Sequence, residues 1–282
     1  MNFPKFWALG ESDGFSSWRW SFQSQSEAQS SADQAARQLA ERYRRGPWPP
    51  TGGDAYYPDR PPREQVLREI SDGRTVTAVI TRNSYGSQVL NTARVMFVDI
   101  DLPEPREPRV GFFQALFGKR RPAPPQASPE LENEALMRVE TWTASNYQWG
   151  WRVYRTRSGL RLLATQGTVS ADAPTTDQIF EALGADPLYR KLCKSQKCFR
   201  ARLTPKPWRC EEDPGKPPRW PWTPKEEKRF HKWEAEYNET SAERATCEFV
   251  RQIGSATVHP EVQSIIQLHD EATKVGLNLP LA

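Results

Sequence analysis

The chain has 282 residues, of which 37% are hydrophobic, and a formal net charge of +4. This length accommodates one large domain or two small ones, and no stretch approaches the roughly 18 apolar residues that a membrane-spanning helix needs. The mild positive charge permits a phosphate-rich partner but is weaker than that of a DNA-coating protein. Because no apolar stretch is long enough, we expect no membrane association. Because residues Met1–Lys5 contain no apolar leader, we expect a cytoplasmic location.

The first part of the chain predicts a strand, two helices and a second strand. Trp18–Phe22 alternates aromatic and polar residues, as a half-buried strand does. Ser24–Arg45 is rich in Ala, Gln, Glu and Arg and begins with a capping serine, which predicts a helix. Arg63–Asp72 has the composition of a short helix that Gly73 ends, and Thr75–Thr81 is typical of a strand.

The next segment, Arg94–Asp101, predicts a buried strand that ends in two carboxylates. Asn83–Gly86 is typical of a turn, and we expect it to join the preceding strand to this one in an antiparallel hairpin. Since side chains alternate along a strand, Asp99 and Asp101 face the same way. Paired carboxylates repel each other, and a divalent cation relieves this repulsion. The alternative is that a strand simply ends here, before Leu102 and Pro103.

Residues 103–129 form a Pro/Arg-rich insertion with a short apolar stretch followed by Lys119, Arg120 and Arg121. We expect a surface loop; the alternative is a flap or a contact with a polyanion. Helices, strands and turns then alternate. The expected helices are 130–147, 175–183 and 186–192, and the expected strands are 150–156, 160–165 and 198–204.

Arginines in these strands are candidate phosphate ligands. Arg161 lies among leucines, and a buried arginine needs a carboxylate or phosphate partner. That partner is Asp99 or Asp101 in a structural ion pair, or a bound triphosphate. The turn before it, Thr156–Gly159, offers backbone N–H groups and the Ser158 hydroxyl at a tight bend, which is a weak signal for an anion-binding nest.

Arg200 and Arg202 share one face of the strand 198–204, and Lys206 follows it. Two guanidinium groups on one sheet face repel each other unless an anion lies between them. A pair of aspartates on one strand and a pair of arginines on another suits either an internal salt-bridge network or a metal ion with a polyphosphate.

Cysteines occur only in the last third of the chain, and their spacing fits no standard zinc motif. We expect free buried thiols, with a zinc or iron–sulfur site as the less favoured alternative. The four are Cys193, Cys198, Cys210 and Cys247. From Pro214 a Pro/Trp-rich linker leads into segments that we expect to be helical throughout, with the last helix opening at His259–Pro260.

The element order predicts an α+β fold: a mixed or antiparallel sheet with helices on its faces and a C-terminal helical tail. We expect residues 1–212 to form the core, with the insertion 103–129, and residues 213–282 to form the linker and the helical C-terminal region.

Three segments in this order resemble motifs of the archaeo-eukaryotic primase superfamily, which includes primase catalytic subunits and primase-polymerases. Val95–Asp101 matches the apolar strand that ends in Asp-x-Asp, and Arg157–Leu162 is similar to the hairpin with a Ser-Gly turn. Phe199–Pro205 is similar to the last motif strand. Arg161 stands where that family has a nucleotide-contacting histidine, and the third acidic residue is replaced. The residues before the last strand are Gln196, Lys197 and Cys198.

The resemblance implies a primase-like catalytic core and a metal-dependent nucleotidyltransferase that acts on nucleotides and single-stranded nucleic acid. Asp99 and Asp101 would be catalytic and hold Mg²⁺ or Mn²⁺. The remaining candidates would contact the triphosphate, the nucleotide or the template phosphates. They are Ser158, Gly159, Arg161, Arg200, Arg202 and Lys206.

Two alternatives remain open at this point. A binding module of the same fold, without the chemistry, is favoured by the replacement of acidic and histidine positions with cations, because cations strengthen polyanion binding and weaken metal binding. A metal-dependent nuclease or other phosphoesterase would use the same two aspartates, but the chain has no evident carboxylate-x-Lys partner for it.

Overall fold

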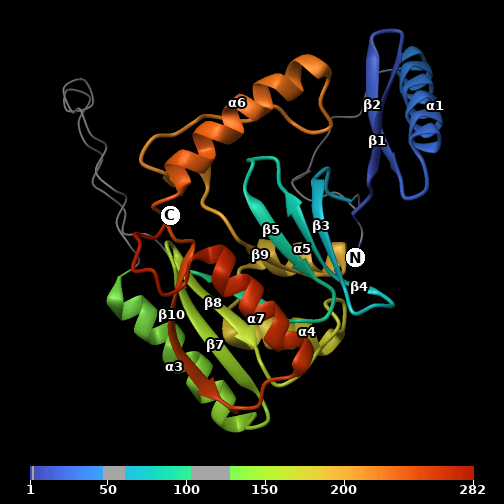
Figure 1. Cartoon of the computed structure of the whole chain (residues 1–282). Helices are drawn as coiled ribbons and strands as arrows, with labels where there is room; N and C mark the ends of the chain where they lie inside the picture. The colour runs from blue at the N-terminus through green and yellow to red at the C-terminus, as the bar shows by residue number, and fades with distance from the viewer. Residues whose placement is uncertain (2, 47–60, 103–127) are drawn as a thin grey trace. The chain divides into compact units, whose positions relative to one another are not determined.

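A computed structural model describes residues 1, 3–46, 61–102 and 128–282. Its elements confirm an α+β fold, with strands in antiparallel sheets and helices packed against them (Figure 1). The predicted insertion 103–129 lies outside the described residues except for its last two positions, which begin a helix. None of the helices in the described ranges is both long and apolar enough to cross a membrane.

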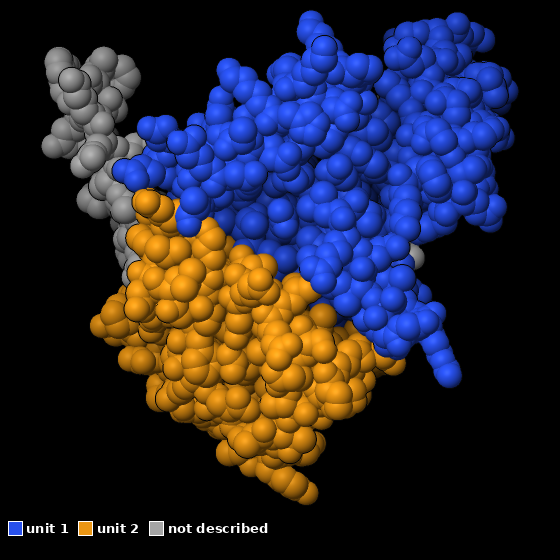
Figure 2. Space-filling view, viewed as in Figure 1, with its two compact units in different colours: residues 1–93, 191–242 blue, residues 94–190, 243–282 orange. Residues whose placement is uncertain are grey.

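The described chain divides into two compact units, each made of two separate segments (Figure 2). Unit 1 comprises residues 1–93 and 191–242, and unit 2 comprises residues 94–190 and 243–282. This division differs from the expected one at residue 212, because strands distant in sequence pair with each other within each unit.

Unit 1 begins with a hairpin covered by a helix. The hairpin strands β1 (Phe6–Ser12) and β2 (Phe15–Ser21) pair in register from Phe6–Ser21 to Ser12–Phe15, and α1 (Gln25–Arg44) packs on them. The buried face of α1 is a stripe of alanines at helical spacing. These small side chains allow a close approach: a Cβ on Gly10 would collide with the backbone of Ala32.

The larger sheet of unit 1 has the order β3-β4-β5-β9. Its strands are β3 (Gln65–Ser71), β4 (Val76–Arg82), β5 (Gln88–Thr92) and β9 (Phe199–Arg202). The helix predicted over 63–72 is wrong, because this segment pairs with β4 along its length and tertiary pairing outweighs its helical propensity. The predicted hairpin is also wrong: after the 83–86 turn, β4 pairs with β5 rather than with the strand that carries Asp99.

Unit 1 is completed by α6 (Pro224–Ser241) and the short 3₁₀ helix η1 (Pro207–Arg209). The start of α6 has a complete capping box between Thr223 and Glu226. Aromatic residues of α6 form a buried cluster, and Tyr237 donates a 2.6 Å hydrogen bond to the Pro205 carbonyl beyond β9. The helix is thereby fastened to the end of the sheet.

Unit 2 is built on a sheet of order β10-β7-β8-β6. Its strands are β6 (Phe97–Asp101), β7 (Gly150–Thr156), β8 (Gly159–Ala164) and β10 (Cys247–Gly254). β6 and β7 are both antiparallel to β8 between them, so they run parallel to each other and are joined through α3 (Pro129–Ser145). The segment 247–254, expected to be helical, is a strand that pairs with β7.

Helices contact both faces of this sheet. On one face, Glu132 of α3 binds Arg155 of β7, and Trp142 of α3 packs against Trp151. On the other face, α7 (Pro260–Thr273) places His269 against Phe97 and Tyr154. The remaining helices are α4 (Pro174–Leu183) and α5 (Pro187–Gln196); the boundary between the units falls within α5. The cross-strand rows of this sheet position the candidate site.

Candidate functional site

The predicted site residues are divided between the two units. Asp99 and Asp101 lie on β6, and Ser158, Gly159 and Arg161 lie in and after the β7–β8 turn of the same sheet. The basic residues of the last predicted strand belong to the other sheet, where β9 pairs with β5. They are Arg200, Arg202 and Lys206. The arginine pair and the aspartate pair therefore do not share a sheet face.

Asp99 and Arg161 form a cross-strand ion pair. The two residues are opposite each other in the β6–β8 register, with Arg161 Nε 2.9 Å from Asp99 Oδ1 and Nη2 3.4 Å from Oδ2. The Arg161 side chain is 2% exposed, whereas that of Asp99 is 30% exposed. Burial opposes the charge on Arg161, but the Asp99 carboxylate outweighs it and raises the pKa of Arg161. Of the two partners that the sequence left open for Arg161, the structure contains the carboxylate.

The Asp99–Arg161 ion pair continues into a buried polar network with α7. Arg161 Nη1 lies 3.4 Å from His269 Nε2, and His269 Nδ1 lies 3.0 Å from Asp270 Oδ1. Arginine has only donors, so His269 Nε2 accepts and its Nδ1–H donates to Asp270. The Tyr154 hydroxyl donates to the same carboxylate at 2.7 Å, and Arg152 donates to the other oxygen at 2.7 Å.

The environment of His269 keeps the imidazole neutral. Burial lowers the pKa of His269, and the neighbouring Arg161 lowers it further against the opposing effect of Asp270. Burial alone would raise the pKa of Asp270, but the hydrogen bonds from His269 and Tyr154 outweigh it and lower that pKa. The network therefore holds an ionised Asp270 carboxylate at its α7 end.

Cys247 completes a cysteine–histidine–aspartate arrangement, since its Sγ lies 3.8 Å from His269 Nε2. Burial raises the pKa of this thiol to about 11, although Arg161 opposes the shift. Because the thiolate is the nucleophile, this geometry holds a protonated thiol in the core rather than an activated one. No local pattern indicates this set, because Cys247 and His269 lie 22 residues apart.

The second aspartate occupies a different environment. Asp101 is exposed and lies opposite Gly159 at the end of the β6–β8 ladder. The adjacent Leu102 N–H donates to the Ser158 carbonyl at 2.9 Å. Position 159 requires glycine, because a Cβ there would collide with the Ile100 carbonyl. The close approach of β6 thus brings the backbone of Asp101 beside the predicted nest.

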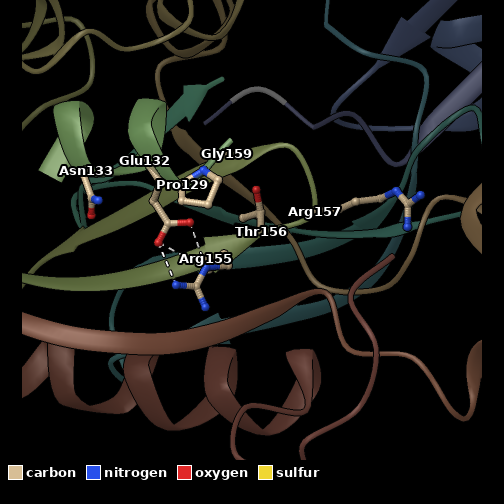
Figure 3. Close-up of a pocket in the computed structure, with 7 residues that line it drawn as sticks. All are labelled: Pro129, Glu132, Asn133, Arg155, Thr156, Arg157 and Gly159. Atoms are coloured by element: carbon tan, nitrogen blue, oxygen red, sulfur yellow. Dashed lines mark hydrogen bonds and ion pairs between the residues drawn. The ribbon is translucent and has the colours of Figure 1, made fainter. Parts of the chain in front are cut away.

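A pocket of about 250 Å³ opens beside this turn, and we call it the hairpin pocket (Figure 3). It is lined by Pro129, Glu132, Asn133, Arg155, Thr156, Arg157 and Gly159. Arg155 turns toward Glu132, with Nη2 2.7 Å from Oε1, and Arg157 extends away from that pair to donate to the Leu281 carbonyl at 3.1 Å. The lining includes the first turn of α3, where backbone N–H groups favour anions.

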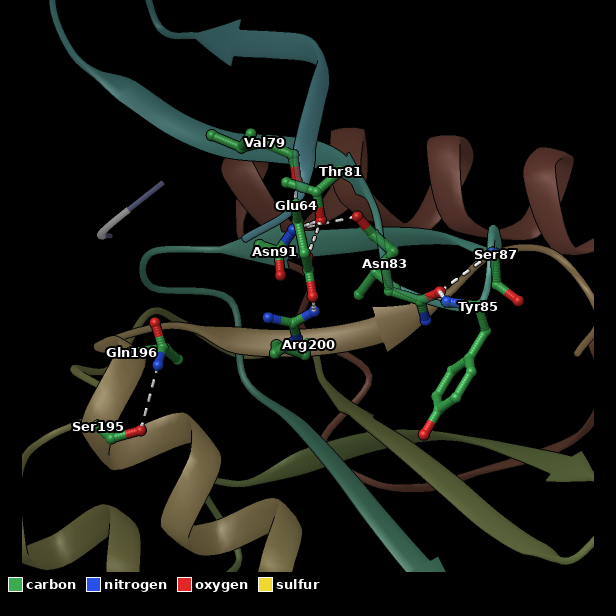
Figure 4. Close-up of polar contacts among 11 residues, drawn as sticks. Glu64, Val79, Thr81, Asn83, Tyr85, Ser87, Asn91, Ser195, Gln196 and Arg200 are labelled. Carbon is green, nitrogen blue, oxygen red and sulfur yellow. Dashed lines mark hydrogen bonds and ion pairs between the residues drawn. The ribbon is translucent and has the colours of Figure 1, made fainter. Parts of the chain in front are cut away.

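In unit 1, Arg200 is engaged by a carboxylate that the sequence reasoning did not consider (Figure 4). Its Nη2 lies 2.7 Å and 2.9 Å from the two oxygens of Glu64. Thr81 donates to Glu64 at 2.6 Å, and Asn91 donates to the Thr81 hydroxyl at 3.0 Å. Burial opposes the charge on Arg200, but Glu64 outweighs it and raises the pKa of Arg200. The salt-bridge alternative therefore describes Arg200 better than a phosphate contact.

The other basic candidates of unit 1 lie near the end of β9. Lys206 Nζ lies 5.6 Å from the centroid of the Trp208 ring, and Tyr85 packs edge-on against the same ring. Val89 pairs with Arg202 across the β5–β9 ladder. Lys206 therefore contacts an aromatic surface of unit 1.

The four cysteines are free thiols, as expected. Three belong to unit 1 and Cys247 belongs to unit 2. Burial raises the pKa of Cys198 to about 11 as well. Within the described ranges, no group of three or more His, Cys, Asp or Glu side chains is arranged to hold a metal ion. Asp99 and Asp101 together supply two carboxylates, one of which is already committed to Arg161.

Comparisons with known proteins identify no relative: no family model, no curated protein and no solved structure matches the chain. The interpretation of the site therefore depends on its own geometry.

Proposed function

We propose that unit 2 is a binding module that holds the phosphate groups of a nucleotide or of single-stranded nucleic acid in the hairpin pocket. The observation that carries the proposal is the pocket itself, which combines Arg155 and Arg157 with polar groups of Asn133 and Thr156 at a tight turn. Its lining has two cations and one carboxylate, Glu132; Arg155 pairs with Glu132 and with Glu248 outside the lining, so Arg157 supplies the charge for an anion. Such a combination favours an anion.

The size of the pocket limits what it holds. Sites that enclose whole small molecules usually measure about 300–1,000 Å³, and the hairpin pocket measures about 250 Å³. A phosphate or diphosphate group fits such a volume, whereas the base of a nucleotide would lie outside it. The protein would thus recognise the ligand mainly through its phosphate groups, and we expect binding with little preference among bases.

The state of Asp99 favours binding over catalysis. To serve as a metal ligand, this carboxylate would have to leave Arg161, which is buried. Leaving the buried Arg161 charge without this partner costs about 2 kcal/mol, since His269 Nε2 remains as an acceptor. A divalent cation would have to supply that free energy in addition to its own dehydration. We therefore rank the binding module above the metal-dependent nucleotidyltransferase.

One observation keeps nucleotidyl transfer as the second candidate function. Asp101 is exposed and stands opposite Gly159, which lines the hairpin pocket. A carboxylate beside bound phosphates is a normal position for a Mg²⁺ or Mn²⁺ ligand. This candidate requires the cation for binding or for incorporation of nucleotides, and it requires Asp101.

Asp101→Asn distinguishes the two candidates in two measurements: binding of a fluorescent single-stranded oligonucleotide and incorporation of nucleotides. A binding module loses a repelling charge, so Asp101→Asn strengthens binding about twofold to fivefold and a chelator has no effect. A transferase loses a metal ligand, so Asp101→Asn abolishes Mn²⁺-dependent incorporation of nucleotides on a single-stranded template.

Arg157→Gln tests the pocket itself. We expect about tenfold weaker binding, since a charge-assisted hydrogen bond contributes roughly 1.5–3 kcal/mol, and a shallower dependence on salt. Arg251→Gln is the matched control, because Arg251 lies in the same unit and pairs with Glu140 on the surface. Equal affinity for the wild type, Arg157→Gln and Arg251→Gln would contradict phosphate binding in this pocket.

A further inference from the structure

A second concave site, in unit 1, is lined by arginines and aromatic rings that none of the foregoing functions uses. It lies between the start of β3, the β4–β5 turn and the segment before α6. We call it the Arg63–Arg219 pocket. Its principal side chains are Arg63, Arg82, Arg219, Trp220, Trp222 and Phe230.

Two of the three arginines of this pocket each have a buried nitrogen without a hydrogen-bond partner in the described structure. Arg82 donates through Nη1 to the Gly86 carbonyl at 3.2 Å and through Nη2 to Glu234, but its buried Nε has no hydrogen-bond partner in the described structure. Arg63 places its guanidinium 4.1 Å from the centroid of the Trp18 ring, and its buried Nε likewise lacks a partner there. Buried donors without an acceptor are rare and costly.

The charges around the pocket also favour the binding of an anion. Burial and the nearby Arg219 lower the pKa of Arg63 to about 10, and Glu226 opposes this only in part. Burial lowers the pKa of Arg82 even though Glu234 binds it. An anion between these groups would reverse both effects, because it stabilises the charged form of each guanidinium.

Aromatic rings and prolines form part of the pocket wall. Trp222 stacks on Phe230 with ring centroids 3.9 Å apart, and Arg82 lies 4.9 Å from the centre of the same Phe230 ring. Pro217 and Pro218 line another side. Such walls exclude water from the guanidinium groups and strengthen their attraction for a negative charge.

We propose that the Arg63–Arg219 pocket binds one small anion, either a halide or a single phosphate group. The cavity measures about 10 Å³, which is the space for one water-sized particle. A halide is larger than water, so it would fill this space and extend toward the exposed Arg219. A phosphate group would place one oxygen there and the others toward the exposed Arg219. The site is independent of the hairpin pocket, which belongs to unit 2.

The test is thermal unfolding of the full chain at fixed ionic strength, with gluconate replaced stepwise by chloride, bromide or phosphate. Gluconate, the bulkiest of these anions, is the reference. An anion that binds only the folded state raises Tm with the logarithm of its concentration. We expect this rise in the wild type, together with broadening of the chloride NMR resonance by the protein.

Variants that weaken anion binding and one that strengthens it make the test specific. Arg219→Gln, a change on the surface, should weaken the apparent affinity for the anion about tenfold, and Arg63→Gln should abolish the rise. Glu226→Gln keeps a residue that can complete the capping box and removes an opposing charge, so it should strengthen binding. Arg68→Gln, an exposed arginine on β3, is the matched control and should behave as the wild type.

The outcomes distinguish the ligands. A rise with chloride and bromide identifies a halide site, and a rise with phosphate alone identifies a phosphate-group site. An equal rise in the wild type, Arg63→Gln and Arg219→Gln would overturn the proposal, as would no rise with any anion, which would mean that the cavity holds water only.

Discussion

The two units each bury an arginine against a carboxylate, but they do so in different ways. In unit 1, Arg200 and Glu64 are both almost fully enclosed, with side chains 9% and 10% exposed. In unit 2, the Arg161 side chain is only 2% exposed, but that of Asp99 is 30% exposed and the contacts of Arg161 continue to His269. The comparison indicates that one network is closed off from solvent, whereas the other connects solvent to a titratable core group.

The largest expected effect comes from breaking the closed pair. Glu64→Gln leaves the Arg200 charge buried without a counter-ion, and we expect a loss of roughly 3–5 kcal/mol in the free energy of unfolding. Urea unfolding measures the loss, and hydrogen exchange shows whether unit 1 opens first. A loss below about 1 kcal/mol would mean that water reaches Arg200 and that the pair is not closed.

The corresponding change in unit 2 should cost less. Asp99→Asn removes the charge that faces Arg161, but solvent still reaches this position and His269 Nε2 still accepts from Arg161. We therefore expect the free energy of unfolding to fall by about 2 kcal/mol. The same urea experiment compares the two variants directly. If Asp99→Asn costs more than Glu64→Gln, the ranking of the two networks is wrong.

Acidification sharpens the comparison. The pKa of His269 is lowered in the folded state from its usual 6.5, so the unfolded chain binds this proton first. Stability therefore falls as the pH drops below about 6.5, by up to about 1.4 kcal/mol per pH unit. His269→Gln should remove this slope between pH 7 and about pH 5, as measured by urea unfolding at each pH. Asp270, whose pKa is also lowered, contributes to this pH dependence only near and below its usual pKa of 3.8. An unchanged slope in His269→Gln would exclude His269 as the source.

The smallest effect concerns the hydroxyl that completes the closed network. Thr81→Val keeps the shape of the side chain but removes the donor to Glu64 and the acceptor for Asn91. We expect a loss of about 1 kcal/mol, measured by the same unfolding experiment. Thr75→Val, on an exposed turn hydroxyl bound to Asp72, is the control and should cost less than half as much.

Local pattern predicted much of unit 2. The apolar run before Asp99 and the hairpin on either side of Ser158 are confirmed as β6, β7 and β8. Arg161 among leucines predicted a buried charge in need of a partner, and Asp99 was one of the partners considered. These features depend on residues close in sequence or on the burial of single strands, which periodicity reports.

The partners contributed from a distance could not be predicted in the same way. Glu64 lies 136 residues from Arg200, in a segment with the composition of a helix. His269 and Asp270 sit on a helix whose spacing gives no indication of which strand it covers. Cys247 begins an edge strand with mostly exposed residues, so its hydrophobic pattern is weak. Only the pairing of strands and the placement of α7 bring these groups together.

The division of each unit into two segments affects how the protein forms during synthesis. The chain leaves one unit for the other after residues 93, 190 and 242. The sheet of unit 1 lacks β9 until residue 202 has left the ribosome, and unit 2 lacks β10 and α7 until still later. Neither unit folds to completion as an uninterrupted stretch of nascent chain, and a single proteolytic cut releases neither one whole. We therefore expect Glu64 and Asp99 to stay solvated until Arg200 and Arg161 have been synthesised, and Arg161 to remain uncovered until α7 follows.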